Sequence, residues 1–354
     1  MSRPGEHEEW ASSSSEPGFT KPEPTANPSS LHGALTEPRP VDPAVIGDKP
    51  TTFGAEPWWT DRNWNRLPEA GRPSAAVIEN GVAGPLAVCG GSLRGRRHQL
   101  AGKPNDDAFE IATVSGSNGE PAWLIIAVCD GVGSAPHSST GARLTATHAV
   151  ALIAHSLRGR LSIGVDRYTE AVRRQGSAFL SRLTGLVRGQ VDRAVTHQSV
   201  LMPNTPPPGT PLSELQTTLT VVGLRTDRTS DGEHEGFVVS VGDSPVFQIN
   251  SDGIVPVSAK AQSSGPWSTV TEGVLGSESL DVHRLHLGPN DALMAATDGV
   301  GNFLHHDQSL TALGRYLHAR WRSPLDSISF LRDLSFDLAS ADDDRTAVLV
   351  WPRP

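Results

Sequence analysis

The chain has 354 residues and a formal net charge of −9, from 30 basic and 39 acidic side chains. This length suits one large domain with a tail better than two domains. The acidic balance, without a basic block, argues against nucleic acid as a partner. No apolar run is long enough to span a bilayer and no signal peptide is visible. We therefore expect a soluble, cytoplasmic monomer without membrane contact.

The first part of the chain differs in kind from the rest. Twelve of the 28 prolines come before residue 74, and no apolar periodicity is present there. Such a segment cannot bury enough apolar surface to offset its chain entropy. We predict a disordered tail over residues 1–75 and a folded domain over 76–354. A tryptophan-rich island in the tail either docks onto a partner or packs on the domain edge; it contains Trp58, Trp59 and Trp64.

The folded part begins near Leu86 with an apolar strand. Residues 91–107, rich in glycine and basic side chains, follow as a predicted loop. Almost every residue of Trp123–Cys129 is large and apolar, which indicates a strand buried on both faces. The two cysteines, Cys89 and Cys129, lie in such strands and are expected to be core residues, because two cysteines form no disulfide framework or zinc motif.

Two helices are predicted after the central strand. Residues 138–157 carry apolar side chains at helical spacing, and 168–200 have the same character with a break near Gly185. The proline-rich stretch 202–211 must be a surface loop.

The remaining elements are mostly strands joined by short connections. The segment 258–280 is polar and is interpreted as a mobile flap, and two helices, over 309–321 and 325–340, precede the last strand. The predicted strands cover residues 216–224, 236–241, 246–249, 282–287 and 346–351. Helices in consecutive pairs argue against a doubly wound parallel sheet. We predict an α+β fold, a four-layer αββα sandwich with two stacked, mostly antiparallel sheets flanked by helix pairs.

Acidic residues recur at the ends of these strands. The clusters are Asp106 and Asp107, Asp130, Asp243, Asp298, and Asp342 to Asp344. If these ends converge, like charges concentrate, and bound cations make that tolerable. Aspartates without histidine or cysteine at matching positions are hard oxygen ligands that suit Mg²⁺ or Mn²⁺. Two such ions activate water for attack on a phosphate ester, so no covalent nucleophile is required.

Six motifs in order resemble the metal-dependent serine/threonine protein phosphatases of the 2C type, in their bacterial branch. They are NDDAF (105–109), CDGVGS (129–134), TTLT (217–220), VGDS (241–244), ATDGVGNF (296–303) and DDRTAVLV (343–350). The resemblance implies hydrolysis of phosphoserine and phosphothreonine in proteins, among them the substrates of a cognate serine/threonine kinase. It also implies two catalytic Mn²⁺ or Mg²⁺ ions and a third, more weakly held one.

The resemblance also implies roles for single residues. Asp130 would bridge the two catalytic metals, and the Gly131 carbonyl would bind one of them. Asp298 and Asp343 would complete the shell of the other, with Asp343 preferred to Asp344 because threonine follows it three residues later. The early pair, Asp106 and Asp107, would hold metals directly or through water. The carboxylate serving the weaker ion would be Asp243.

Two positions depart from the family pattern. Gly102 stands where many members have an arginine that grips the phosphate, and we expect His98 or Lys103 to replace it. Arg96 and Arg97 are expected to face solvent and attract substrate, with Arg94 and Arg143 as further candidates for the grip. Val132 stands where animal members carry a histidine. Nearby His137 is a weaker candidate for a general acid.

Two other interpretations compete with an active phosphatase. GDSP at residues 242–245 is similar to the motif of GDS-type serine esterases, with Ser244 as nucleophile, but it lies mid-domain and lacks the expected Asp-x-x-His. A catalytically weak or inactive relative that binds partners is the better rival. It would be expected to lose metal carboxylates, and all the core ones are present.

Overall fold

The computed structural model describes residues 76–116, 119–158, 160–161, 163–196, 206–257, 273–338 and 341–353. The predicted tail, its tryptophan island and residues 258–272 of the predicted flap lie outside the described residues. Val274 and Leu275, at the end of that flap, are buried in the core. Within the described ranges, no helix combines the length and the apolar character needed to cross a membrane.

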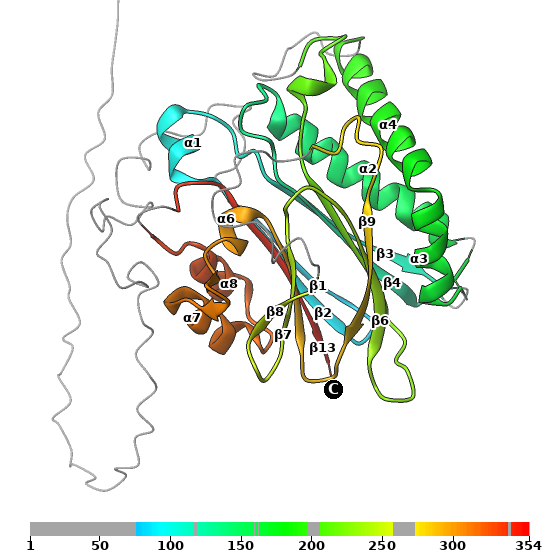
Figure 1. The fold of residues 1–354 in the computed structure, drawn as a ribbon, viewed down its shortest axis with the longest axis vertical. Coiled ribbons are helices and arrows are strands. Elements are labelled where there is room, and N and C mark those ends of the chain that lie inside the picture. Colours follow the sequence, from blue (N-terminus) through cyan, green and yellow to red (C-terminus); the bar gives the residue numbers. More distant parts are fainter. Residues whose placement is uncertain are drawn as a thin grey trace, which may run out of the picture. The chain divides into compact units, whose positions relative to one another are not determined.

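Two antiparallel sheets form the middle of the domain (Figure 1). The six-stranded sheet has the order β1 (Ala76–Ala83), β2 (Leu86–Leu93), β13 (Arg345–Pro352), β10 (Ala292–Ala296), β7 (Val246–Ile249) and β8 (Ile254–Pro256). The five-stranded sheet has the order β3 (Ala108–Ser115), β4 (Pro121–Cys129), β5 (Leu219–Arg225), β6 (His234–Val241) and β9 (Asp281–Leu287). A small hairpin joins β11 (His305–His306) to β12 (Ser309–Leu310).

Helices cover the outer face of each sheet (Figure 1). The five-stranded sheet packs against α2 (Ser138–Arg158), α3 (Val165–Arg174) and α4 (Gly176–Thr196). The six-stranded sheet packs against α7 (Ala312–Trp321) and α8 (Ser327–Leu334). Short helices α1 (Arg96–Ala101) and α6 (Asp298–Gly301) lie at strand ends, and a 3-10 turn covers Leu212–Glu214. The predicted four-layer sandwich is confirmed.

Alternation along β4 explains why its sequence is apolar throughout. Trp123, Ile125 and Ala127 belong to the core beneath the helices, whereas Leu124 and Ile126 belong to the core between the two sheets. A strand with helices on one face and a second sheet on the other has no solvent side. The prediction that residues 123–129 form a strand buried on both faces is confirmed, because all of them are buried. The prediction that Cys129 is a core residue is confirmed for the same reason.

Four details of the predicted element order were wrong. The predicted loop over 91–107 contains α1, and β1 was not predicted. The second long helix breaks at Gln175, not at Gly185, which lies inside α4. Finally, β7 does not continue the meander of β5 and β6. Gly242, with a φ of +96°, turns the chain across to the other sheet, where β7 pairs with β10.

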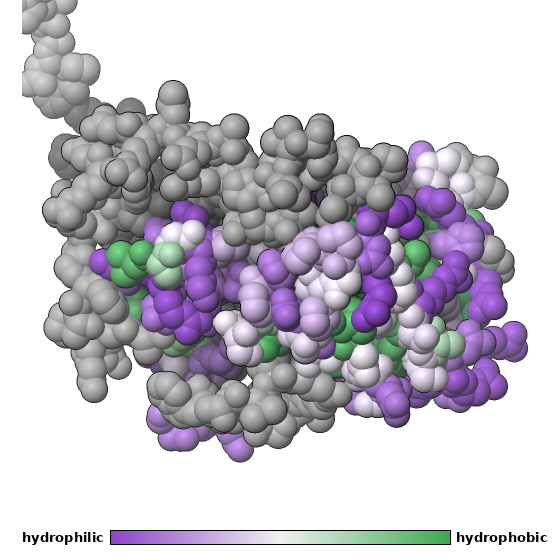
Figure 2. All heavy atoms as spheres, turned by 90° about the horizontal axis from the view of Figure 1, so that it is seen from above, coloured by the Kyte–Doolittle hydropathy of each residue, from purple (hydrophilic) through white to green (hydrophobic). Residues whose placement is uncertain are grey.

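Seen from above, the described surface is mostly hydrophilic, with hydrophobic residues in small separate areas (Figure 2). The exposed large apolar side chains include Leu100 on α1 and Ile328 on α8. Scattered apolar residues of this kind are ordinary on a protein surface. The acidic strand ends, by contrast, gather at one end of the sandwich.

Candidate metal centre

Strand register brings the acidic strand ends together. Ala108 pairs with Cys129, so the acids before β3 lie beside Asp130 at the end of β4. In the other sheet Ala296 pairs with Ala347, which places the start of α6 beside the loop before β13. The acidic clusters therefore meet at the end of the sandwich that carries α1 and α6 (Figure 1).

Threonines before β5 hold the backbone of Asp130. The Asp130 amide donates to the Thr218 hydroxyl at 2.9 Å. Its carbonyl accepts from the Thr217 hydroxyl and from the Thr218 amide, both at 2.8 Å. The first two threonines of the TTLT motif therefore hold the backbone of Asp130 in place. Because three hydrogen bonds fix its backbone, the position of the Asp130 side chain is set before any ligand binds.

Gly131 fills a position that only glycine fits. A β-carbon there would lie 2.6 Å from the Asp106 carbonyl oxygen and 2.8 Å from the Ser138 β-carbon. The Gly131 amide donates to that same Asp106 oxygen at 3.0 Å. The close approach ties the end of β4 to the acidic pair before β3.

Asp107 is buried at the base of the cluster. Its carboxylate accepts a hydrogen bond of 2.8 Å from the hydroxyl of Thr297, the residue before α6. Burial raises the pKa of Asp107 well above the ordinary 3.8, and the negative charges of Asp344 and Asp298 raise it further. Burial likewise raises the pKa of Asp106.

The carboxyl groups of Asp130 and Asp298 are neighbours in the cluster, and each acts on the pKa of the other. Two buried carboxylates side by side repel each other unless a proton or a cation reduces their charge. Burial is the main cause that raises the pKa of both, and the charge of Asp107 raises that of Asp130 further. A cluster that retains protons because its carboxylates crowd one another suits cations that prefer oxygen ligands. The residues present therefore fit Mg²⁺ or Mn²⁺.

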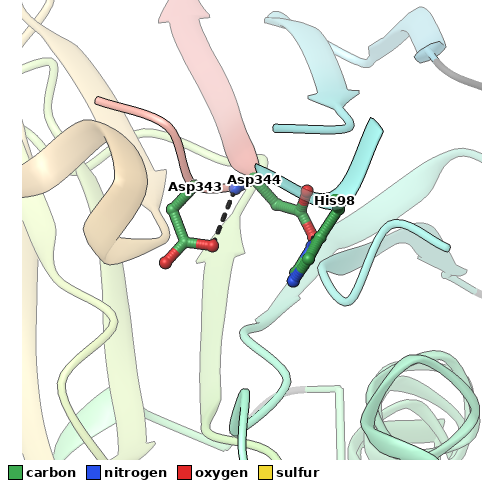
Figure 3. A group of neighbouring side chains, drawn as sticks. All are labelled: His98, Asp343 and Asp344. Atoms are coloured by element: carbon green, nitrogen blue, oxygen red, sulfur yellow. Dashed lines mark hydrogen bonds and ion pairs between the residues drawn. The ribbon is translucent and has the colours of Figure 1, made fainter. Parts of the chain in front are cut away.

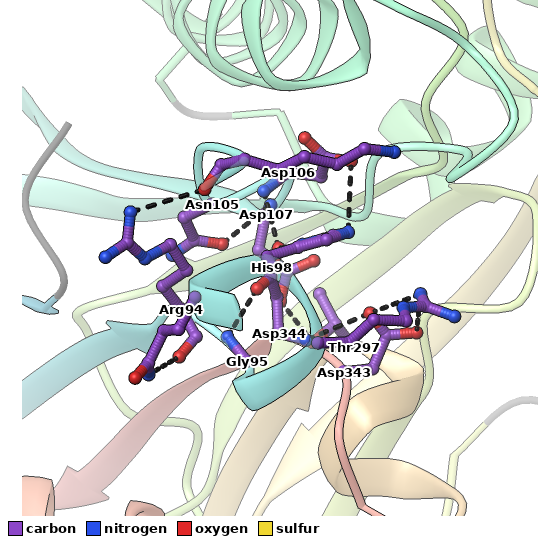
Figure 4. A network of polar contacts seen from close by, with 12 residues as sticks. Arg94, Gly95, His98, Asn105, Asp106, Asp107, Thr297, Asp343 and Asp344 are labelled. Atoms are coloured by element: carbon purple, nitrogen blue, oxygen red, sulfur yellow. Dashed lines mark hydrogen bonds and ion pairs between the residues drawn. The ribbon is translucent and has the colours of Figure 1, made fainter. Parts of the chain in front are cut away.

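Asp344 joins three segments at the edge of this cluster (Figure 4). Its carboxylate accepts from the amides of Gly95 and Asp106, each at 2.5 Å, and lies 2.8 Å from His98 Nδ1. Asp344 and His98 are both buried. These contacts dock α1 and the segment before β3 onto the loop before β13.

His98 and Lys103 occupy different environments. The second ring nitrogen of His98, Nε2, lies 3.7 Å from Asp106 Oδ2, so both nitrogens face carboxylates. The hydrogen bond to Asp344 is the main cause that raises the pKa of His98. Lys103 is exposed, and its charge acts on Asp106. This geometry favours His98 as a residue that positions the loop, and a phosphate grip by His98 or Lys103 stays a prediction.

Asp343 presents its carboxylate on the open side of the same loop. Ligand atoms of His98, Asp343 and Asp344 lie within 4.8 Å of one another (Figure 3). Asp344 is engaged by the contacts just described, whereas the Asp343 side chain is 43% exposed. Arg97 is exposed, as expected, and it also pairs with the cluster, because both Asp343 oxygens lie 3.0 Å from its Nη2.

A family model described as Protein phosphatase 2C matches residues 94–329, more than half of the chain. The chain belongs to the protein phosphatase 2C family. The match begins at the loop before α1 and ends within α8, so it covers the five-stranded sheet, strands β7, β8 and β10 of the six-stranded sheet, and four of the five acidic clusters.

Solved structures of phosphatases were also found among the similar chains. A serine/threonine phosphatase of S. agalactiae is 15% identical, with 78% of this chain and 99% of that chain covered and a TM-score of 0.46. The catalytic domain of PstP, in complex with two manganese ions, is 14% identical, with 76% and 99% covered and a TM-score of 0.45. RsbX in complex with magnesium is 12% identical, with 77% and 98% covered and a TM-score of 0.41. No curated protein matches.

Asp243, in the GDS motif of this 2C-family chain, follows the turn that leads from β6 to the other sheet. Its charge is one cause that raises the pKa of Asp298. Ser244 beside it is buried, its hydroxyl lies 2.8 Å from that of Thr218, and its carbonyl accepts from Thr220. These hydrogen bonds connect the start of β7 in one sheet to β5 in the other. Because the Ser244 hydroxyl is buried and already hydrogen-bonded, it is poorly placed to act as the nucleophile of an esterase.

His137 lies at the start of α2. Its Nε2 is 4.0 Å from Glu214, and its Nδ1 is buried without a hydrogen-bond partner. The contact with Glu214 and the backbone bond from the His137 amide to the Glu214 carbonyl, at 2.8 Å, favour a structural role.

The roles of three residues in this site were not predicted from the sequence. Asp344 joins α1 to the segment before β3, Thr297 donates to Asp107, and Arg97 pairs with Asp343. Thr297 stands directly before the Asp298 motif, and a polar residue between an apolar strand and a ligand was a usable signal. The other two are set by contacts between segments about 246 residues apart.

Proposed function

We propose that this 2C-family protein hydrolyses phosphoserine and phosphothreonine in proteins, with Mn²⁺ or Mg²⁺ bound at the carboxylate cluster. The observation that carries the proposal is the strand register of both sheets, which gathers Asp107, Asp130 and Asp298 into one buried group of aspartates whose pKa values are raised. Purely structural carboxylates usually gain basic partners, whereas the charges that act on Asp107, Asp130 and Asp298 are those of other aspartates.

Asp130, directly after β4 of the five-stranded sheet, would contact both catalytic ions, with the Gly131 carbonyl on one of them. Asp298 and Asp343 come from the other sheet and would hold the second ion. Asp107 and Asp106 would complete the set, directly or through water. Asp243 is farther along the turn after β6 and would serve an additional, weaker ion. These assignments follow the family motifs residue by residue.

When bound there, the divalent ions supply an activated water and charge stabilisation for attack on phosphorus. The chain contributes positioning. The threonines before β5 fix Asp130, and Thr297 orients Asp107 through its hydrogen bond. Oxygen ligands alone do not distinguish Mg²⁺ from Mn²⁺, and the similar structures named above include one with each ion. The physiological substrate would be a phosphoprotein, among others one made by a serine/threonine kinase.

The test is hydrolysis of p-nitrophenyl phosphate and of a phosphothreonine peptide by metal-stripped protein, with Mn²⁺, Mg²⁺ or Ca²⁺ added back. We expect activity with Mn²⁺ or Mg²⁺ and its loss by two orders of magnitude or more in Asp130→Asn and Asp298→Asn. Asp252→Asn, on the exposed β7–β8 hairpin, is the matched control and should keep wild-type turnover. Mn²⁺ binding without hydrolysis of either substrate would instead support the inactive, partner-binding relative.

A further inference from the structure

Arg97 makes a two-pronged ion pair at the mouth of the candidate metal centre. Its Nη2 lies 3.0 Å from each oxygen of Asp343, and its amide donates to the Asp342 carbonyl at 2.9 Å. The two side chains are 53% and 43% exposed. An ion pair this exposed adds little to stability, so its presence calls for another explanation.

The guanidinium of Arg97 also reaches toward the turn after β4. Its Nη2 would be 3.9 Å from a β-carbon on Gly133, the second glycine after Asp130. Arg97 therefore lies between the loop before β13 and the glycine turn, which are the two sides of the aspartate cluster. A ligand that enters the cluster from solvent meets this cation.

The backbone explains why the family's usual arginine position is not used here. Gly102 has a φ of +66° and ends α1 in a left-handed turn. Its amide and that of Lys103 donate to Gln99 and His98, the pattern of a Schellman cap. A side chain at Gly102 would be strained, so a phosphate-binding cation has to come from another position.

Other nearby cations are less well placed. Arg94 donates to the Lys103 carbonyl at 3.3 Å, which ties it to its own loop. His98 is buried between Asp106 and Asp344. Arg97 differs because its partner, Asp343, is itself a candidate metal ligand.

We propose that Arg97 is an exchangeable counter-ion that couples metal binding to phosphate binding. Without metal it pairs with Asp343; when a divalent cation takes that carboxylate, the guanidinium is released to bind phosphoryl oxygens of the substrate. The planar fork that matches two carboxylate oxygens matches two phosphate oxygens equally well. This inference rests on the proposed function, because it requires Asp343 to bind a metal.

The coupling has a definite sign. Removing the guanidinium frees Asp343 from a competitor, so Mn²⁺ should bind as tightly as before or more tightly. The same change removes a charge-assisted donor, so phosphate should bind more weakly. Because coupling between two ligands is reciprocal, phosphate should also promote Mn²⁺ binding less in the variant than in the wild type. If Arg97 had a merely structural role, its removal would weaken the binding of Mn²⁺ and of phosphate together.

The experiment uses the full chain as wild type, Arg97→Ala, Arg97→Lys, Lys103→Ala and Arg96→Ala. Arg96 is the neighbour in the same helix and lies 4.0 Å from Asp337, so it is a matched control. Calorimetry gives the Mn²⁺ affinity of metal-stripped protein and the inorganic phosphate affinity of Mn²⁺-loaded protein. For Arg97→Ala we expect unchanged or tighter Mn²⁺ binding and phosphate binding weaker by about ten- to a hundredfold. Arg97→Lys should be intermediate, and Arg96→Ala should match the wild type.

Three outcomes would overturn the proposal. If Arg97→Ala bound Mn²⁺ more weakly and phosphate with unchanged affinity, Arg97 would only position the Asp343 carboxylate. Unchanged affinity for both would return Arg97 to the solvent-facing role first expected. The same phosphate loss in Lys103→Ala, and not in Arg97→Ala, would assign the grip to Lys103. By contrast, a wild-type protein that binds no Mn²⁺ would reject the proposed function itself.

Discussion

His98 Nδ1 and Asp344 Oδ2 lie 2.8 Å apart, and both side chains are buried. The same Asp344 oxygen accepts from the Asp106 amide, so this pair links α1 to the segment that carries two candidate metal ligands. The pair therefore holds together α1, the segment before β3 and the loop before β13. Its disruption should therefore affect both stability and metal affinity.

The pH dependence of this pair follows from the raised pKa of His98, whose main cause is the hydrogen bond to Asp344. A histidine with a raised folded pKa contributes stability fully below its ordinary value of 6.5 and loses it as pH rises through the folded value. We expect His98→Gln to destabilise the metal-stripped protein by about 1–3 kcal/mol at pH 6 and by less at pH 9. Urea unfolding at both pH values measures this. His155→Gln, on the exposed end of α2, is the control.

An equal loss at both pH values would mean that His98 stays neutral and acts only as a hydrogen-bond donor. An unchanged Mn²⁺ affinity in His98→Gln, measured in the same preparations, would show that the pair supports the fold without positioning the metal ligands.

Metal binding should release protons. Asp107, Asp130 and Asp298 have pKa values raised mainly by burial, so the metal-free cluster retains protons above the ordinary 3.8. Mn²⁺ binds the deprotonated carboxylates and must displace those protons. Calorimetry of Mn²⁺ binding at pH 6, in buffers of different ionisation enthalpy, should show net proton release that declines as pH rises. Release that is absent at every pH would contradict the raised pKa values of these three carboxyl groups.

The same crowding should make the metal-free site a source of instability. A carboxyl with a raised folded pKa favours folding most below its ordinary pKa and loses this contribution as pH rises through the folded value. Asp130→Asn removes one charge, and its amide can still donate to Asp298. We expect this variant to be more stable than wild type by on the order of 1–3 kcal/mol at pH 7.5 with EDTA.

With Mn²⁺ the order should reverse, because the wild type gains stability from the bound ion and the variant gains much less. Thermal unfolding in EDTA and in Mn²⁺ provides both readouts, with Asp252→Asn as the control. A lower melting temperature for Asp130→Asn in EDTA would show that the carboxylate is well accommodated without metal.

The layers of the fold could be predicted from the sequence because they depend on local patterns, and the same patterns marked the strand ends that carry the candidate ligands. Apolar runs ending in Asp-Gly marked Asp130 and Asp298, and short connections marked antiparallel sheets. The node at Asp344 could not be predicted, because its partners, Gly95 and His98, lie more than 240 residues away in the chain. Helix α1 is too short for a periodic signal, and its place is set by those contacts.

The last prediction concerns Gly102, where the left-handed cap of α1 excludes the arginine found in many family members. A β-carbon there meets nothing within 4 Å, so any cost of substitution comes from the backbone, whose φ is +66°. Gly102→Ala should therefore lower the free energy of unfolding by about 1–2 kcal/mol. Gly102→Asn should cost less, because asparagine tolerates this region.

The matched control for Gly102→Ala is Gly185→Ala, another glycine with open space around it but inside α4. There alanine should stabilise the protein by about 0.5–1 kcal/mol, because a helix interior favours it. Urea unfolding of Gly102→Ala, Gly102→Asn and Gly185→Ala distinguishes the two effects by their opposite signs. If Gly102→Ala were neutral and Gly102→Arg restored phosphate affinity to an Arg97→Ala protein, α1 would end without the left-handed turn. The family's usual arginine position would then be usable in this chain.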